Sequence, residues 1–213
     1  MQFDEFLKRM PKLGNLQLLG QEAQFEMAPD ERIRALSEMD IEAKNPRWAG
    51  VMAVFYPNAE GETTLVLILR KTYKGVHSNQ VGFPGGKAET LDQSIKHTAL
   101  RETEEEVGLA QSEIEVVKKL TKLYIPPSNF WVQPFIGYVK ETPRFIKEGA
   151  EVEAILEVSL KQFLDDKSVI TQRIDTSYGT MLDVPAFYLA EHVVWGATAM
   201  MLSEVKWALQ QLD

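Results

Sequence analysis

Residues 101–108 carry the densest charge in the chain, because four of the five positions from 102 to 106 are glutamate. The segment from Asp92 to Val107 has the apolar spacing of a helix, and Gly108 supplies a stop signal at its end. Glutamates four residues apart on a helix repel each other and cost about 0.2–0.5 kcal/mol per pair. A helix that carries them therefore needs a compensating interaction.

Three of these glutamates share one arc of the predicted helix. Glu102 and Glu106 continue the apolar stripe that Ile95 begins, Glu105 lies beside them, and Glu104 points away. Carboxylate oxygens gathered beside a buried stripe are ligands that Mg²⁺ and Mn²⁺ prefer. The alternative is a solvated acidic helix face, which is the usual fate of a charge run.

A glycine pair precedes this helix. Gly85 and Gly86 allow the backbone to approach a ligand closely, so a carbonyl there could complete a metal shell. An ordinary turn after Pro84 is the alternative. The chain has no cysteine and 3 histidines, which excludes thiolate ligands and nucleophiles and disfavours a histidine-rich metal centre.

Composition places the chain among ordinary globular proteins. It has 213 residues, 45% hydrophobic and 25% charged, so it is neither collagen-like nor wholly disordered. Its net charge of −8 makes it a poor general binder of nucleic acid or anionic membranes. Because the N-terminus lacks a long apolar core and Glu191 interrupts the most apolar stretch, we expect a cytoplasmic protein without a membrane partner.

The apolar patterns predict a mixed sheet flanked by helices. Residues 1–45 are expected to form an N-terminal extension, with one helix over residues 2–10 that Pro11 ends and another over residues 30–39. Residues 46–213 are expected to form the main domain. Strands are predicted over residues 49–56, 63–69, 114–124, 131–139, 169–174 and 181–189, and helices over 92–107, 160–165 and 193–212.

A set of residues at fixed spacing resembles the signature of the Nudix hydrolases: Gly86, Arg101, Glu102, Glu105, Glu106 and Gly108. Asp92 stands where the family has glutamate, and eight residues rather than seven separate it from Arg101. Both departures resemble the coenzyme A pyrophosphatase branch of the family. The resemblance implies an α/β (α+β) fold, a Nudix-type α/β/α sandwich with a mixed central sheet.

Three further segments are similar to that branch. Residues 67–86 resemble its upstream motif, with Asn79 at a position where the branch has glycine. Asparagine tolerates positive φ better than most residues, so the turn can survive there. Residues 126–130 and 195–199 also look like branch features, and the resemblance runs from about Ala49 to the C-terminus.

The resemblance implies metal-dependent hydrolysis of a phosphoanhydride. Glu102 and Glu106 would be the principal ligands of Mg²⁺ or Mn²⁺, and Gly86 would offer its carbonyl. Glu105 would be a third ligand or would help to activate water, and Arg101 would orient Glu105. Coenzyme A or a derivative would be cleaved to 3′,5′-ADP and 4′-phosphopantetheine.

A general base for such enzymes is often supplied by a loop outside the signature helix. Glu151 and Glu153 precede a predicted element and are candidates, with Glu151 ranked first. The alternative for either residue is an acid at the surface.

Basic residues near the glycine pair are candidates for substrate binding. Arg70, Lys71 and Lys87 could hold phosphates in an otherwise acidic chain, or they could simply keep the loop soluble. His77 could donate to a phosphate or fix the loop.

Two other functions are compatible with the same residues. One is hydrolysis of ADP-ribose or another nucleoside diphosphate derivative, and the other is a binding or regulatory role without catalysis. Every acid of the signature is present if Asp92 is accepted in place of glutamate. This disfavours a role without catalysis. A homodimer is suggested by family analogy alone.

Overall fold

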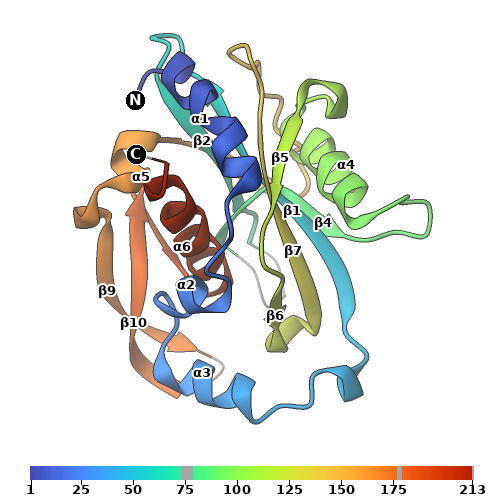
Figure 1. The fold of residues 1–213 in the computed structure, drawn as a ribbon. Coiled ribbons are helices and arrows are strands. Elements are labelled where there is room, and N and C mark those ends of the chain that lie inside the picture. The colour runs from blue at the N-terminus through green and yellow to red at the C-terminus, as the bar shows by residue number, and fades with distance from the viewer. Residues whose placement is uncertain (73–78, 177–178, 213) are drawn as a thin grey trace.

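The computed structural model describes residues 1–72, 79–176 and 179–212, and a mixed eight-stranded sheet lies at its centre (Figure 1). The sheet runs in the order β3 (Val81–Gly82), β2 (Thr63–Arg70), β1 (Arg47–Pro57), β7 (Phe130–Tyr138) and β5 (Glu115–Lys119). β4 (Gly85–Lys87) also pairs with β1, β6 (Leu123–Ile125) with β7, and β8 (Val152–Ser159) with β2. The β1–β7 pair is parallel and the other pairs are antiparallel, which confirms the expected mixed sheet.

Helices cover both faces of this sheet. α4 (Ile95–Val107) packs on one face, and α1 (Phe3–Asn15), α2 (Gln21–Phe25) and α6 (Gly196–Gln210) lie on the other (Figure 1). Successive side chains of a strand point to opposite faces. In β1, Met52 and Val54 accordingly join the core under α4, whereas Ala53 and Phe55 join the core under the other helices. The α/β/α arrangement is therefore present.

A second, antiparallel sheet contains β9 (Val169–Thr176), β10 (Gly179–Leu189) and β11 (His192–Trp195). The predicted helix over residues 193–212 was wrong at its start, because residues 192–195 pair with β10 and α6 begins at Gly196. Gly196 has a φ of +66°, which lets the chain turn from strand to helix.

The first helix also differs from expectation. Pro11 was predicted to end it, yet α1 continues to Asn15 with the proline inside. The apolar stripe of α1 runs on to Leu13, which is fully buried, while Pro11 is exposed. Burying a leucine side chain contributes about 1.5–3 kcal/mol, comparable to the roughly 3 kcal/mol that an internal proline costs.

The remaining elements follow the sequence with local differences. α3 (Asp30–Ser37) and α5 (Leu160–Leu164) lie where helices were predicted. The strand predicted over residues 114–124 is split into β5 and β6, and β8 was not predicted. Short 3₁₀ turns are η1 (Glu42–Lys44), η2 (Gln111–Glu113), η3 (Pro126–Ser128) and η4 (Asp166–Ser168).

The helix α4 starts three residues later than predicted. Ser94 is its N-cap and accepts a hydrogen bond from the His97 backbone amide at 3.1 Å. The helix sits close against β1 at Gly50, where a Cβ would lie 2.4 Å from the Ile95 carbonyl oxygen. A glycine in β1 thus sets how near α4 can approach the sheet.

None of the helices in the described part of the chain combines the length and apolar character that a membrane span requires.

Candidate active site

The acidic helix α4 places its carboxylates against the β4 strand. The Gly85 amide donates a hydrogen bond to Glu106 Oε2 at 2.8 Å. A Cβ on Gly86 would lie 2.4 Å from the carboxyl carbon of Glu102. Gly86 is therefore required as glycine by the close approach of Glu102, and the two acids and the glycine pair form one site.

Arg101 is the positive charge that compensates the acidic run. Its Nη1 lies 3.0 Å from Glu102 Oε1 and 3.0 Å from Glu105 Oε2. Its Nε and Nη2 both donate to the Asp92 carboxylate at 3.0 Å. Asp92, whose side chain is 3% exposed, thus anchors Arg101 and lies in the turn before the helix rather than among the helical acids.

The guanidinium of Arg101 holds the pKa of Asp92 well below its usual range. A carboxyl whose pKa is lower in the folded protein than in the unfolded chain stabilises the folded state at pH values above its unfolded pKa, which is near 4. This contribution is lost as the pH falls through the folded pKa.

We expect Asp92→Asn to lower the free energy of unfolding at pH 7 by roughly 3 kcal/mol, because it weakens a buried ion pair. In thermal unfolding without metal, this corresponds to a decrease of about 6–12 °C in Tm. The difference from the wild type should shrink at pH 3. Glu89→Gln, in the same turn, is the control, and an equal loss in both variants would refute this role of Asp92.

Glu106 is the most buried of the helical acids. The residue is 3% exposed, and its Oε1 has no hydrogen-bond partner among the described residues. Arg70 Nη1 lies 3.6 Å from this oxygen. Burial raises the pKa of Glu106 to about 7. A buried carboxylate oxygen without a hydrogen bond is costly, and a bound cation would relieve that cost.

The donor set fits a hard divalent cation. Within the described residues, no three His, Cys, Asp or Glu side chains are already gathered at metal-binding distances. Glu102 Oε1 and Glu105 Oε2 are instead held by Arg101. The orphan Oε1 of Glu106 and the adjacent Glu102 nevertheless offer the oxygen ligands that such ions take.

Glu151 lies in a loop that is attached to the end of α4. The Ile146 amide donates to the Val107 carbonyl at 2.9 Å, and the Glu148 amide donates to the Glu106 carbonyl at 3.1 Å. Burial raises the pKa of Glu102, and the negative charge of Glu151 adds to that increase. The loop thus brings Glu151 within electrostatic range of the helical acids.

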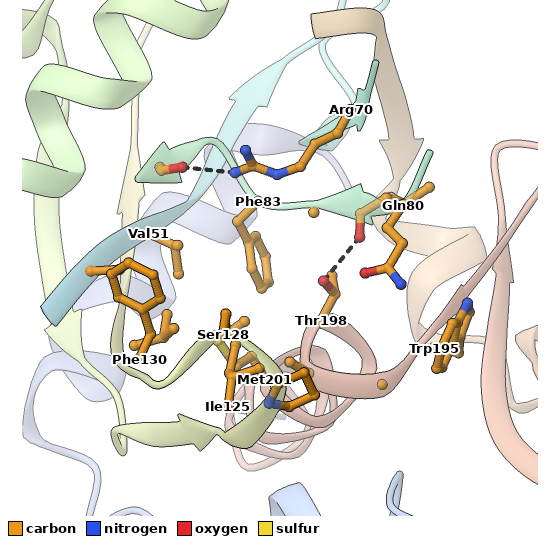
Figure 2. A pocket seen from close by; sticks show the side chains of 18 of the residues that line it. Val51, Arg70, Gln80, Phe83, Ile125, Ser128, Phe130, Trp195, Thr198 and Met201 are labelled. Carbon is orange, nitrogen blue, oxygen red and sulfur yellow. Dashed lines mark hydrogen bonds between the residues drawn. The ribbon is translucent and has the colours of Figure 1, made fainter. Parts of the chain in front are cut away.

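The predicted substrate-binding residues have different surroundings. Arg70 Nη2 donates to the Gly85 carbonyl at 2.9 Å, which places its guanidinium at the glycine pair (Figure 2). Lys71 Nζ donates to the Gly149 carbonyl, in the loop that carries Glu151. Lys87 is exposed, and its carbonyl accepts from Arg101 Nη2 at 3.2 Å. His77 lies outside the described residues, so its role stays a prediction.

A cavity of about 470 Å³ opens beside β4 (Figure 2). Gly86 and Lys87 line it next to the acids. Its other walls are largely apolar and come from several separate segments, with Phe83, Ile125, Phe130, Trp195 and Met201 among their residues. Thr198 Oγ1 donates to the Val81 carbonyl at 2.9 Å and so ties the start of α6 to β3.

Sequence reasoning missed part of this cavity. Trp195 lines the cavity, although it was not among the residues predicted to bind substrate (Figure 2). Pro29 and Arg32, from the N-terminal extension, also line it. The similarity of residues 195–199 to a family motif was a usable signal for Trp195, whereas nothing in the local sequence marked Arg32. Asn79 has a φ of +55°, as expected for a residue at a glycine position.

Comparison with known proteins identifies the family. Residues 46–174 match the NUDIX domain family. The chain is a member of the Nudix family. Its glycine pair, Arg101 and helical acids lie within the matched residues.

Named relatives of this Nudix protein occur in plants and bacteria. It is 31% identical to Nudix hydrolase 15, mitochondrial, of Arabidopsis thaliana over 177 residues, which cover 81% of this chain and 61% of that protein. It is 33% identical to the uncharacterized Nudix hydrolase NudL of Photorhabdus laumondii over 69% of this chain and 78% of that protein. The chain spans 61% and 53% of the two plant relatives that it matches.

Solved structures support the Nudix fold. A Nudix hydrolase from M. Smegmatis, RenU, superposes with a TM-score of 0.54 at 13% identity and covers 79% of this chain and 88% of its own. A MutT/nudix family protein from Enterococcus faecalis has a TM-score of 0.53 at 16% identity. The match covers 92% of this chain and 75% of that protein. At these identities the likeness concerns the fold alone.

Proposed function

We propose that this protein is a Mg²⁺- or Mn²⁺-dependent hydrolase that cleaves the diphosphate bond of coenzyme A or its derivatives, giving 3′,5′-ADP and 4′-phosphopantetheine. One observation carries the proposal: the glycine pair, whose Gly85 amide contacts the acidic helix, lines a cavity together with segments that resemble the coenzyme A pyrophosphatase branch. These segments include residues 80–87 and 195–198, which lie far apart in the sequence.

The cavity suits the two parts of such a substrate. Its charged end, with Arg70 and Lys87, would bind the diphosphate through charge-assisted hydrogen bonds. Its apolar walls would cover the nucleoside or the pantetheine arm and exclude water from the bound substrate.

The residues of the chain divide the chemistry among them. Glu102, Glu106 and the Gly86 carbonyl would hold the divalent cation, which when bound supplies positive charge at the phosphoryl oxygens. Water attacks one phosphorus, the bridging P–O bond breaks, and the other phosphate leaves. Glu151 would accept the proton of the attacking water at its carboxylate, or Glu105 would do so while Arg101 holds it.

Product analysis tests the proposed function. The full chain should convert coenzyme A and Mg²⁺ to 3′,5′-ADP and 4′-phosphopantetheine, resolved by chromatography, and EDTA should abolish the reaction. Hydrolysis of ADP-ribose with no reaction of coenzyme A would assign another nucleoside diphosphate substrate. Activity that persists in EDTA would contradict the proposed cation site.

The proposed base can be tested separately. We expect Glu151→Gln to lower kcat about 100-fold or more with little change in KM, because a general base contributes about 100- to 10,000-fold. Glu153→Gln, two residues along the same chain, is the matched control and should stay within about 2-fold of the wild type. Full turnover by Glu151→Gln would transfer the role to Glu105.

A further inference from the structure

A second cavity, of about 750 Å³, lies on the opposite face of the central sheet from the first, 470 Å³ cavity beside β4. Trp48 of β1 and Gln133 of β7 line the second cavity, whereas their neighbours Ala49 and Val132 line the first. Adjacent residues of a strand point to opposite faces, so the sheet separates the two cavities. The second cavity lies between the sheet and the start of α4, on the side away from α6 (Figure 1). The glycine pair lines only the first of them.

The charge of the second cavity is opposite to that of the whole chain. Three of the eight described residues that line it are exposed lysines, Lys96, Lys119 and Lys122, and none of the eight is an acid. They come from the first turn of α4, the end of β5 and the segment between β5 and β6. Within the described part of the chain, no carboxylate forms an ion pair with any of the three. In a chain of net charge −8, these lysines create a local positive field that attracts anions.

Two tryptophan rings hold Lys122 in place. Its Nζ lies 4.0 Å from the centre of the Trp131 ring and 5.4 Å from that of the Trp48 ring, and the two rings stack 6.4 Å apart. A ring face attracts an ammonium group without neutralising its charge, because the ring carries a quadrupole and no net charge. Glu42 Oε1 accepts from the Trp131 indole N–H at 3.3 Å, at the edge of that ring, and Glu42 does not line the cavity. Lys122 is therefore positioned and still available to an anion.

Trp48 gives the cavity an aromatic surface that solvent reaches. Its side chain is 38% exposed, and Ile95 and Phe135, which pack in the core under α4, line the cavity beside it. An exposed indole is a stacking surface for a nucleobase, and lysines bind phosphates as point charges. A polyphosphate alone would leave the indole unused, and an uncharged nucleoside would leave the lysines unused. The two features together fit a nucleotide, whereas the net charge of −8 disfavours a long nucleic acid.

We propose that this cavity is a second nucleotide site, which binds a nucleoside diphosphate or triphosphate with its base against Trp48 and its phosphates on Lys96, Lys119 and Lys122. Three lysines match more than one phosphate charge, so a polyphosphate chain is preferred over a monophosphate. The site is independent of the proposed function, because it contains neither the glycine pair nor any acid, and it requires no divalent cation.

Fluorescence in EDTA tests this site without turnover. The full chain with Trp195→Phe serves as the reporter protein, because this substitution removes the tryptophan that lines the first cavity. ADP should quench the remaining indole emission along a saturable curve. Adenosine and inorganic pyrophosphate each lack one half of the ligand and should bind at least about 10-fold more weakly than ADP. No quenching by ADP, or equal affinity for pyrophosphate, would refute the nucleotide site.

A pair of lysine substitutions separates the site from the general charge of the protein. Lys96→Gln with Lys119→Gln should weaken ADP binding to the reporter protein about 10-fold or more, because two charged contacts are lost. Lys161→Gln with Lys167→Gln is the matched control, since it changes the net charge equally at exposed positions that line neither cavity. The control should bind ADP within about 2-fold of the reporter protein. Equal weakening in both pairs would overturn the site.

Trp48→Leu in the reporter protein tests the base contact, with Trp131 left to report binding. ADP should bind about 5-fold or more weakly, because a stacking surface is lost, whereas pyrophosphate affinity should change less than about 2-fold. The lysine pairs, which alter only exposed side chains, decide the question if Trp48→Leu does not fold. Displacement of ADP by a polyglutamate peptide at lower concentration than by ATP would assign the cavity to an acidic polypeptide and overturn the proposal.

Discussion

Glu106→Gln is expected to lower kcat about 1,000-fold while making the metal-free protein more stable at pH 8. The activity is lost because the variant removes the charge of the buried oxygen that fits the cation. Glu104→Gln is the matched control, since Glu104 is exposed on the opposite side of the same helix, where it accepts a bond from Gln111 at 2.7 Å. Full turnover by Glu106→Gln would remove Glu106 from the site.

The stability effect follows from the raised pKa. The pKa of Glu106 in the folded protein is about 7, above the value of about 4.3 in an unfolded chain. Between these values the folded state binds the proton that the unfolded state releases, so the stability contributed by this group falls as the pH rises. Glutamine is neutral at every pH, so the variant does not lose this stability as the pH rises.

Thermal unfolding in EDTA measures the effect. At pH 8 the variant should be more stable by on the order of 2 kcal/mol, or about 4–8 °C in Tm. The difference should shrink as the pH is lowered and disappear below about pH 4. Saturating Mg²⁺ should reverse the order at pH 8, because the wild type gains stability from the bound ion and the variant gains less. A variant less stable than the wild type at pH 8 in EDTA would contradict the raised pKa.

Gly86→Ala is expected to lower kcat by about 100-fold or more and to weaken the binding of the metal. The new Cβ would lie 2.4 Å from both the carboxyl carbon and Oε2 of Glu102, so this carboxylate would have to move. Misplacing a positioned group by about 1 Å can cost about 100-fold in rate. Isothermal titration with Mn²⁺ and steady-state kinetics with coenzyme A measure the two effects.

Gly149→Ala is the matched control for this substitution. Gly149 lies in the loop before β8 and has no heavy atom within 4 Å of the position of a Cβ. Its replacement should leave turnover and metal binding within about 2-fold. Wild-type metal affinity in Gly86→Ala would show that Glu102 can bind the ion from another position.

Local patterns were sufficient for much of the main domain. The runs in β1 and β2 are apolar throughout because both faces are covered, and this continuous pattern predicted two buried strands. The spacing of Glu102 and Glu106 predicted that they would lie together at the edge of the apolar face of α4. These features depend on residues close in the sequence, where a helical or extended period applies directly.

Features that depend on distant partners could not be predicted in the same way. Residues 192–195 became a strand because β10 is available to pair with them. Leu13 keeps α1 helical beyond Pro11 because other parts of the chain bury it. Arg32 reaches the cavity through its packing near Tyr124, which is 92 residues away in the sequence. Local patterns in the sequence do not predict such contacts between distant residues.

The hydrogen bond from Gln24 Nε2 to Glu204 Oε2 has a consequence for biosynthesis. These residues are 180 positions apart, and they join α2 to α6. At about 5–20 residues per second, a ribosome needs about 9–36 s to synthesise the intervening segment. During this time the N-terminal helices lack the helix that will cover them, so a nascent chain of this protein exposes apolar surface to chaperones until α6 has been synthesised.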